Sequence, residues 1–411
     1  MDLRKDCNTI IKYALEKVQP DLVVKKALEG RKFSGRVFVV SVGKAGWTMA
    51  RAAVSLPEIK VFRGIVITKH GHSNGPIGNL EIFEAGHPIP DQNSFTATAR
   101  ALEMTEGLQA DDTVLFLLSG GGSALFEKPL IGEAEMQNIT DQLLRCGAEI
   151  TEINAVRKRL SAVKGGKFAR HLAPAKVISV ILSDVLGDRT DMIASGPTVE
   201  DKSTGKETME IIEKYGITCS EKALKLIGTE IGARPDNTET IVGGSVRELC
   251  LAGKEAAEKL GYQTEVITDS LDCEARDAGE MLAKLAKQHI NEGITKPMAI
   301  LAAGETVVHL TGKGKGGRNQ ELALAAAKEI SGMKNVAVFS FGSDGTDGPT
   351  DAAGGFVTGE TKTELESQNI VIEQVLQDND AYHALEKIGG LIFTGPTGTN
   401  VNDLSVVLIR P

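Results

Sequence analysis

Six short apolar segments of this chain each end in a turn rich in glycine, serine, threonine or aspartate. The turns lie at residues 41–46, 119–124, 183–188, 312–317, 342–351 and 394–400. Helical patterns recur between these segments, and strand–helix alternation on this scale predicts parallel sheets with helices on both faces. Ligands bind beyond the carboxyl ends of the strands in such sheets. We therefore expect these turns to supply the binding groups of the protein.

The length of 411 residues is too great for one ordinary hydrophobic core and indicates two α/β domains. Residues 233–238 combine Pro, Asp and Asn after a helical pattern, and a new strand–turn–helix unit starts beyond them. We predict one domain over residues 1–236 and a smaller one over 237–411, facing each other across a cleft. A single long helix is predicted over 154–171.

Composition and charge restrict the class of protein. The formal net charge of −9 argues against nucleic acid as the main partner, and no apolar run is long enough for a membrane span. The first residues form an amphipathic helical pattern rather than a signal peptide. Five cysteines without a CxxC pair fit a reducing compartment and no zinc site. We expect a cytoplasmic protein, and a homo-oligomer is left open.

Two turns in the first half of the chain suit an anion. Gly43 and Lys44 follow the apolar run 37–42, and a lysine there can act as a point charge on a phosphate or carboxylate. Gly120, Gly121 and Gly122 stand between Ser119 and Ser123, and consecutive glycines can form a nest of backbone N–H groups. The competing interpretations are a solvent-facing lysine and a flexible turn.

The segment 304–324 has the richest concentration of such features. Five glycines are followed by Arg318 and Asn319 at the start of a helical pattern, so free N–H groups and the positive end of the helix dipole point at one place. Gly316 and Gly317 are the expected anion-binding glycines. The spacing of Gly312, Gly314 and Gly317 satisfies GxGxxG, but no acid ends a strand about twenty residues later, which disfavours a dinucleotide site.

Carboxylates at strand ends are the candidate acid–base and metal groups. Asp184 ends an apolar strand, where a general base or a metal ligand is common. Asp188, Asp344 and Asp347 are weaker candidates for holding Mg²⁺ through oxygen. Asx turns without a metal explain these aspartates equally well. His70, His72 and His87 are interpreted as polar loop residues.

Eight segments together resemble the glycerate kinases of the MOFRL type. They read VGKAG, GHPIPD, LLSGGGSAL, INAVRKRLSAVKGG, SDVLGD with IASGPT, GETVV with GKGGRNQELAL, GTDGPTDAAG and GPTGTNVNDL. The similarity covers nearly the whole chain and is weakest at the N-terminal helix and near residues 200–240. It implies a Rossmann-like N-terminal domain, a smaller α/β C-terminal domain and an interdomain cleft.

The resemblance also implies ATP-dependent phosphorylation of D-glycerate, with 2-phosphoglycerate as the favoured product. Lys44 and Arg318 would then be the charged catalytic pair and Asp184 a third polar participant, with Mg²⁺ or another divalent cation arriving with ATP. Two alternatives stay open: an NAD(P)H-dependent hydroxypyruvate reductase, which needs an acid histidine, and a non-catalytic protein that binds small carboxylates.

Overall fold

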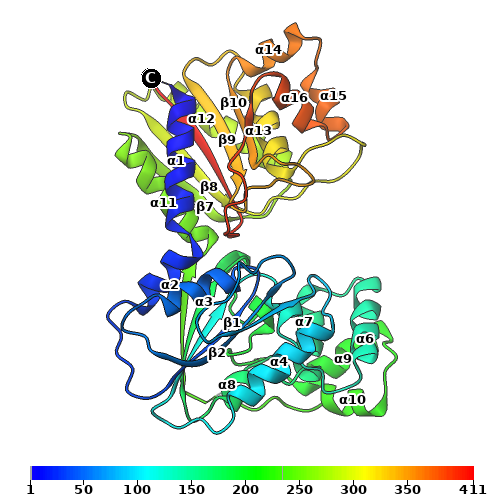
Figure 1. Cartoon of the computed structure of the whole chain (residues 1–411). Helices are drawn as coiled ribbons and strands as arrows, with labels where there is room; N and C mark the ends of the chain where they lie inside the picture. Colours follow the sequence, from blue (N-terminus) through cyan, green and yellow to red (C-terminus); the bar gives the residue numbers. More distant parts are fainter. Residues whose placement is uncertain (1, 234) are drawn as a thin grey trace. The chain divides into compact units, whose positions relative to one another are not determined.

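The chain forms two compact α/β units, described by a computed structural model over residues 2–233 and 235–411, without the side chain of Asp188. One unit is Pro20–Gly243, and the other joins Met1–Gln19 to Gly244–Pro411 (Figure 1). The units thus differ from the predicted division at 236/237, because helix α1 (Leu3–Lys17) packs on α11 (Val246–Lys259). The predicted cleft stays a prediction.

The unit Pro20–Gly243 contains a six-stranded sheet in the order β3-β2-β1-β4-β5-β6, and the described pairings of its first five strands are all parallel. The strands are β1 (Val37–Val42), β2 (Val61–Lys69), β3 (Glu81–Ala85), β4 (Thr113–Leu118), β5 (Lys176–Leu182) and β6 (Thr238–Gly244). This is the expected Rossmann-like order, which reverses between β1 and β4. Both strands are buried along their full length, as their unbroken apolar runs require.

Helices cover both faces of this sheet. Helices α2 and α3 contact one face, whereas α4 contacts β2 and β3 on the other (Figure 1). A separate apolar cluster is formed by α6, α7, α9 and α10. The helices are α2 (Pro20–Leu28), α3 (Gly46–Val54), α4 (Gln92–Met104), α5 (Gly122–Leu125), α6 (Glu133–Arg145), α7 (Ile150–Leu160), α8 (Lys167–His171), α9 (Gly205–Tyr215) and α10 (Glu221–Ile227), with short 3-10 turns η1 (Leu186–Asp188) and η2 (Ile193–Ser195).

The single helix predicted over 154–171 is wrong, because the structure has two helices there. Helix α7 ends at Leu160, Ser161 is extended, and α8 starts at Lys167. Gly165 and Gly166 between them adopt the left-handed conformation that glycine tolerates best. The break places Lys164 in a buried loop instead of on a helix face.

The other unit has a sheet in the order β11-β10-β9-β12-β8-β7. The strands are β7 (Gln263–Leu271), β8 (Met298–Gly304), β9 (Val336–Gly342), β10 (Gly354–Thr358), β11 (Leu391–Ile392) and β12 (Asp403–Ile409). The C-terminal strand β12 runs antiparallel between β8 and β9, so this sheet is mixed and not parallel as predicted. The α/β class of both units is confirmed.

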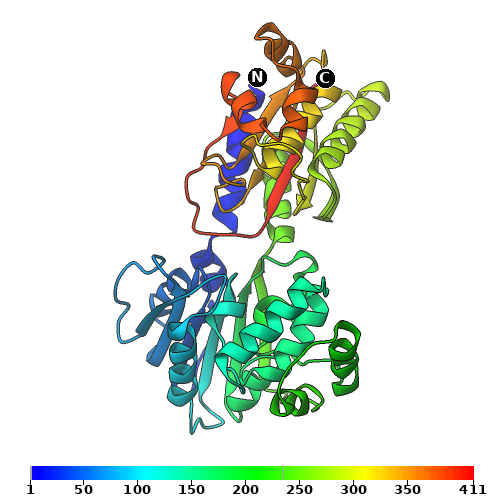
Figure 2. The same cartoon turned by 90° about the vertical axis from the view of Figure 1, so that its right-hand side faces the viewer.

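Helices also cover both faces of the mixed sheet, as Figures 1 and 2 show. Helix α11 contacts β7 and β8 on one face, and α13 contacts β9 and β10 on the other. The remaining helices of this unit are α12 (Ala275–Asn291), α13 (Arg318–Glu329), α14 (Thr361–Ser367), α15 (Ile372–Gln377) and α16 (Ala381–Lys387). None of the described helices combines the length and the apolar character of a bilayer span.

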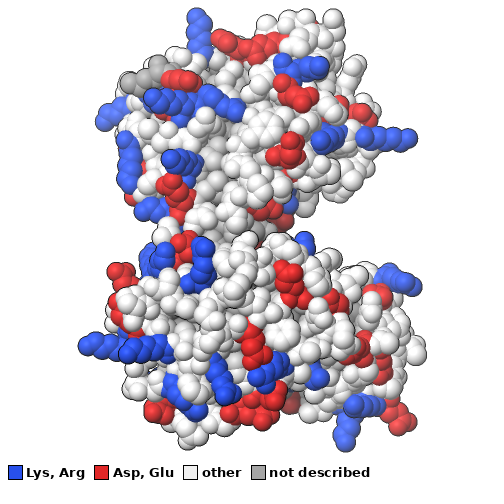
Figure 3. Space-filling view, viewed as in Figure 1, with Lys and Arg blue, Asp and Glu red and all other residues white. Residues whose placement is uncertain are grey.

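Charged side chains of both signs are interspersed over the viewed face of each unit (Figure 3). No single sign dominates that face, although the chain as a whole carries a formal charge of −9. Local groups therefore decide the electrostatics of a site there, because dissolved salt screens exposed charges that are more than about 10 Å apart.

The core below the β1–β4 turns should dominate the stability of the Pro20–Gly243 unit. Leu172 is fully buried in this core, so Leu172→Ala should lower the free energy of unfolding by about 2–5 kcal/mol. Leu144 is 58% exposed, and Leu144→Ala should change the free energy of unfolding by less than about 1 kcal/mol. Urea unfolding followed by circular dichroism measures both, and equal effects would contradict the assigned core.

Candidate functional site

The turns after β1 and β4 are joined to each other by hydrogen bonds at the point where the strand order reverses. The backbone N–H of Lys44 donates to Gly120 O at 2.9 Å, and Ser119 N donates to Val42 O at 2.9 Å. The N–H of Ala45 donates to the buried Ser119 hydroxyl at 3.0 Å. A Cβ at Gly43 would overlap Ser119, so glycine is required there. Gly43 and Ser119 therefore hold the two turns together.

The glycine turn after β4 has backbone donors that the described residues do not use. No described residue accepts a hydrogen bond from the backbone N–H of Gly120, Gly121, Gly122 or Ser123. Gly121 is left-handed, with φ of 90°, and α5 starts directly after it. A run of unpaired N–H groups around a left-handed residue forms an anion-binding concavity. We call Gly120–Ser123 the glycine nest.

Lys44 and His87 lie beside this nest. No described residue forms a hydrogen bond or an ion pair with the ammonium group of Lys44. The backbone carbonyl oxygen of Lys44 lies 3.1 Å from Nδ1 of His72. A Cβ at Gly121 would lie 3.0 Å from His87 Cδ2 and 3.5 Å from Lys44 Cγ. Burial and the Lys44 charge lower the pKa of His87, so the neutral ring is favoured. The sequence analysis interpreted His87 only as a polar loop residue and did not predict its place beside the nest.

Asp184 lies on the other side of the nest, just after β5. A Cβ at Gly120 would overlap its carboxylate, so only glycine allows this approach. Asp184 is half-buried. The structure therefore brings Lys44, the nest and Asp184 together at one edge of the sheet, whereas the predicted metal ligand Asp188 has a side chain outside the described atoms.

A buried ammonium group supports the nest from below. Lys164 Nζ donates to the carbonyls of Ser123 at 3.0 Å, Phe126 at 3.2 Å and Ala194 at 3.5 Å. Its partner carboxylate is Glu127, at 3.4 Å. Lys164 therefore fixes both ends of α5. The sequence analysis assigned no role to Lys164, because the helix predicted over 154–171 concealed its position.

Two left-handed residues pack against the same turn. Ala194 and Ser195 have φ of 51° and 59°, which non-glycine residues adopt only when their surroundings hold them. Ser195 Oγ donates to Asn154 Oδ1 at 2.9 Å and lies 3.4 Å from Ser123 Oγ. The segment 194–196 is thereby held against the nest by α7.

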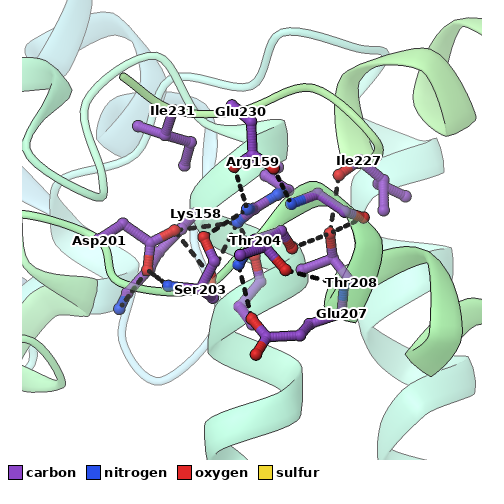
Figure 4. Close-up of polar contacts among 12 residues, drawn as sticks. Lys158, Arg159, Asp201, Ser203, Thr204, Glu207, Thr208, Ile227, Glu230 and Ile231 are labelled. Carbon is purple, nitrogen blue, oxygen red and sulfur yellow. Dashed lines mark hydrogen bonds and ion pairs between the residues drawn. The ribbon is translucent and has the colours of Figure 1, made fainter. Parts of the chain in front are cut away.

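A charged cluster at the end of α7 anchors that helix (Figure 4). Asp201 accepts from Arg159 Nη1 at 2.9 Å and from Lys158 Nζ at 3.2 Å, and Ser203 O accepts from Arg159 Nη2 at 2.8 Å. Arg159 and Asp201 are both buried, so loss of one partner would leave an uncompensated charge. This cluster holds α7 in place next to the nest.

In the other unit, Asp347 caps the helix that follows the glycine-rich loop. Its carboxylate accepts from Gln320 N at 2.8 Å and from Asn319 N at 3.1 Å. A Cβ at Gly317 would overlap Asp347. Burial raises the pKa of Asp347 to about 7, against the lowering effect of these N–H donors. The structure thus corrects the expectation that Asp347 is a free metal ligand; it caps α13.

Arg318, the first residue of α13, is held by two carboxylates. Its Nε and Nη2 donate to the two oxygens of Asp403 at 2.5 and 3.0 Å, and Nη1 donates to Glu305 at 3.0 Å. Asp403 is buried, whereas the Glu305 side chain is 45% exposed. Arg318 is therefore oriented by Asp403, and its exposed edge is covered by Glu305.

The glycine-rich loop uses most of its N–H groups within the protein. The N–H groups of Gly312, Lys313 and Gly314 donate to residues 378–379, and Lys315 N donates to Asp380 at 2.8 Å. Gly312 and Gly314 are needed because a Cβ would overlap that backbone. The turn 312–317 is predicted to supply binding groups, but the N–H groups of its first four residues are used within the protein instead. Among the described residues, none accepts from Gly316, Gly317 or Arg318 N–H.

A metal site made by the protein alone is not found among the described residues, which contain no group of three suitable His, Cys, Asp or Glu side chains. Asp344 accepts from Thr346 N at 2.9 Å and forms an Asx turn.

Known proteins resemble the chain over its full length. Residues 6–228 match a domain of unknown function (DUF4147), and residues 298–403 match the MOFRL family. The D-glycerate 2-kinase of Thermotoga maritima is 50% identical over 99% of this chain and 98% of the relative. The glycerate 2-kinase of Pyrococcus horikoshii is 39% identical over 96% and 91%. A crystal structure of glycerate kinase from Thermotoga maritima matches with a TM-score of 0.96 and 49% identity, covering 99% of each chain.

The buried Lys164 makes stability depend on pH in a defined direction. Burial lowers the pKa of Lys164 from 10.5 to about 8, so the unfolded chain binds this proton more tightly between those values. Raising the pH through that window should therefore stabilise the fold. Between pH 8 and 9.5, the unfolding free energy of the wild type should rise by about 1–2 kcal/mol relative to Lys164→Met. Urea titrations at both pH values measure this, and a constant difference would contradict it.

Proposed function

Because this chain belongs to the MOFRL-type glycerate kinase family, we propose that it transfers the γ-phosphoryl group of ATP to D-glycerate. The observation that carries the proposal is the glycine nest, whose N–H groups have no acceptor among the described residues and lie beside Lys44, whose ammonium group likewise has no partner among them. Together they form a site for an anionic oxygen at the strand reversal of a Rossmann-like sheet. The proposed products are ADP and 2-phosphoglycerate.

The residues of the nest would act mainly by positioning and charge neutralisation, which dominate catalysis of phosphoryl transfer. The N–H groups of Gly120–Ser123 would bind phosphate or carboxylate oxygens. Lys44 would neutralise charge on the same group. Of the other predicted binding residues, Gly43 and Ser119 would act by holding the turns together.

Asp184 is the proposed proton acceptor. The hydroxyl oxygen of glycerate would form a bond to the γ-phosphorus while the bond from that phosphorus to the β–γ bridging oxygen breaks, and the hydroxyl proton would pass to the Asp184 carboxylate. The half-buried position of Asp184 at the end of β5, against Gly120, suits this task.

Arg318 would neutralise negative charge on the moving phosphoryl group, and the N–H groups of Gly316 and Gly317, which no described residue uses, would bind anionic oxygens. Asn319 would orient that end of α13.

We also propose Mg²⁺ as the ion that accompanies ATP. When bound, it would neutralise phosphate charge and align the phosphates. Asp344 is the remaining described candidate from the predicted metal ligands. The protein is further proposed to act in the cytoplasm.

One assay separates the kinase from the two alternatives. The protein is incubated with ATP, Mg²⁺ and D-glycerate, and ADP release is measured while phosphorus NMR identifies the product. NADH with hydroxypyruvate in a parallel reaction tests the reductase. Oxidation of NADH without ADP formation would replace the kinase proposal, and binding of glycerate without either turnover would favour the binding protein.

Lys44→Met should lower kcat by about 10²–10³-fold, the usual cost of removing one charge-stabilising donor. The matched control is Lys60→Met, which removes an exposed lysine from the same unit. Initial rates with ATP and D-glycerate measure both variants. Near-normal turnover by Lys44→Met would remove this residue from the catalytic set.

Arg318→Ala should lose several orders of magnitude in kcat, because a transition-state cation is worth about 10³–10⁵ in such reactions. Arg318→Ala leaves the buried Asp403 carboxylate without its arginine, so Arg318→Lys is a necessary second variant. It keeps the positive charge but loses the bidentate hydrogen bonds to Asp403. Circular dichroism checks that both fold. An Arg318→Lys enzyme with wild-type kcat would limit the role to charge alone, and a fully active Arg318→Ala would overturn it.

A further inference from the structure

His87 lies beside the glycine nest and has no part in the function proposed so far. It follows β3 and precedes α4, and its side chain is half-buried. A Cβ built at Gly121 would lie 3.0 Å from Cδ2 and 3.3 Å from Nε2 of the His87 ring. The edge of the ring that carries Nε2 therefore faces the nest.

The histidines of the chain differ in whether the protein itself binds their rings. Every histidine except His87 has a ring nitrogen within hydrogen-bonding distance of a protein oxygen: His70, His72, His171, His289, His309 and His383. No described residue supplies such a partner to either ring nitrogen of His87. Polar groups withdrawn from bulk water are normally paired. The Nε2 atom of His87 is therefore available to a ligand in the nest.

The groups around His87 favour an anion as that ligand. Burial lowers the pKa of His87, and the charges of Lys44, Lys69 and His72 lower it further. A second full positive charge is thus disfavoured beside Lys44, and the ring is neutral. A neutral imidazole still carries one N–H donor. The His87 ring therefore adds a hydrogen-bond donor to the anion site without adding a charge that repels Lys44.

The position of Nε2 decides which form of the ring an anion selects. In a neutral imidazole one nitrogen donates and the other accepts, and the hydrogen-bond partners determine which is which. An anionic oxygen over Gly121 would repel a lone pair on Nε2 and attract a proton there. The form with the proton on Nε2 is therefore the one that an anion in the nest stabilises.

We propose that His87 is a substrate-binding residue whose Nε2–H donates a hydrogen bond to the anionic oxygen in the glycine nest, an inference that rests on the proposed kinase function. The bound oxygen would then receive three kinds of contact: backbone N–H groups from the nest, a full charge from Lys44 and a directional donor from His87. Such an oxygen belongs to a phosphate of ATP or to the carboxylate of glycerate, which share this chemistry.

Removing the ring nitrogens while keeping a planar ring tests the contact. At about pH 7.5, His87→Phe should weaken binding of inorganic triphosphate or of D-glycerate about 10–100-fold by calorimetry, the usual effect of losing a hydrogen bond to a charged group. Weaker binding of triphosphate assigns the contact to a phosphate, and weaker binding of D-glycerate assigns it to the carboxylate. Unchanged affinity for both ligands in a folded His87→Phe would overturn the proposal and leave His87 with packing against Gly121 alone.

Two further variants separate the hydrogen bond from general effects of the substitution. His70→Phe is the matched control, because His70 lies in the same unit, has a side chain that is 55% exposed and is already paired with Asp91. It should leave both affinities unchanged. His87→Gln places an amide N–H near the position of Nε2 and should recover part of the affinity that His87→Phe loses. A folded His87→Gln that binds no better than His87→Phe would contradict donation from Nε2.

Nitrogen NMR of the imidazole rings provides a readout that does not depend on turnover. The Nε2 signal of His87, assigned by its absence in His87→Phe, should move on saturation of the wild type with the ligand that His87→Phe binds less tightly, while the His70 signals stay in place. An unmoved His87 signal would refute the contact. A wild type that shows this shift but does not phosphorylate D-glycerate would refute the proposed function and leave the His87 contact standing.

Discussion

The hydrogen bonds that join the turn after β1 to the turn after β4 determine what the strand-end site offers. The backbone N–H of Lys44 donates to Gly120 O, and that of Ala45 donates to the Ser119 hydroxyl. The glycine turn is thereby held from outside and needs none of its own donors for its shape. Four consecutive N–H groups therefore have no acceptor within the described part of the chain, and the Lys44 side chain lies beside them. Rigid support and free donors are the two conditions for preorganised anion binding.

A buried lysine supplies the second half of that support. Lys164 replaces its water shell with three carbonyl groups and one carboxylate, and the carbonyls come from both ends of α5 and from segment 194–196. Removing charge from water is costly, which is reflected in the lowered pKa of this residue. The strained Ala194 and Ser195 are held in the same assembly, so strain and buried charge are concentrated directly behind the nest.

Much of the fold followed from local patterns, since apolar runs, glycine turns and helical periodicity predict α/β units. The antiparallel β12 did not, because strand direction within a sheet depends on tertiary pairing. The same limit applied to the site. Lys44 and the glycine nest are local features, whereas the loss of Gly312 and Gly314 as anion donors depends on a segment more than sixty residues away. The capping of α13 by Asp347 also depends on a distant residue, 27 positions further along the chain.

Lys44 and Arg318, the two candidate cations, differ in how far neighbouring carboxylates neutralise their positive charge. Lys44 has no carboxylate partner among the described residues, so its full charge attracts an anion before any rearrangement. Arg318 is neutralised by Asp403 and Glu305, and these contacts are unequal. Asp403 is buried and accepts hydrogen bonds from two nitrogens of Arg318. Glu305 is exposed and accepts from one, so breaking the Arg318–Glu305 contact costs about 1 kcal/mol or less. Because the contact with Asp403 fixes the guanidinium group and the contact with Glu305 only covers its exposed edge, Arg318 would keep its orientation if an anion took the place of Glu305.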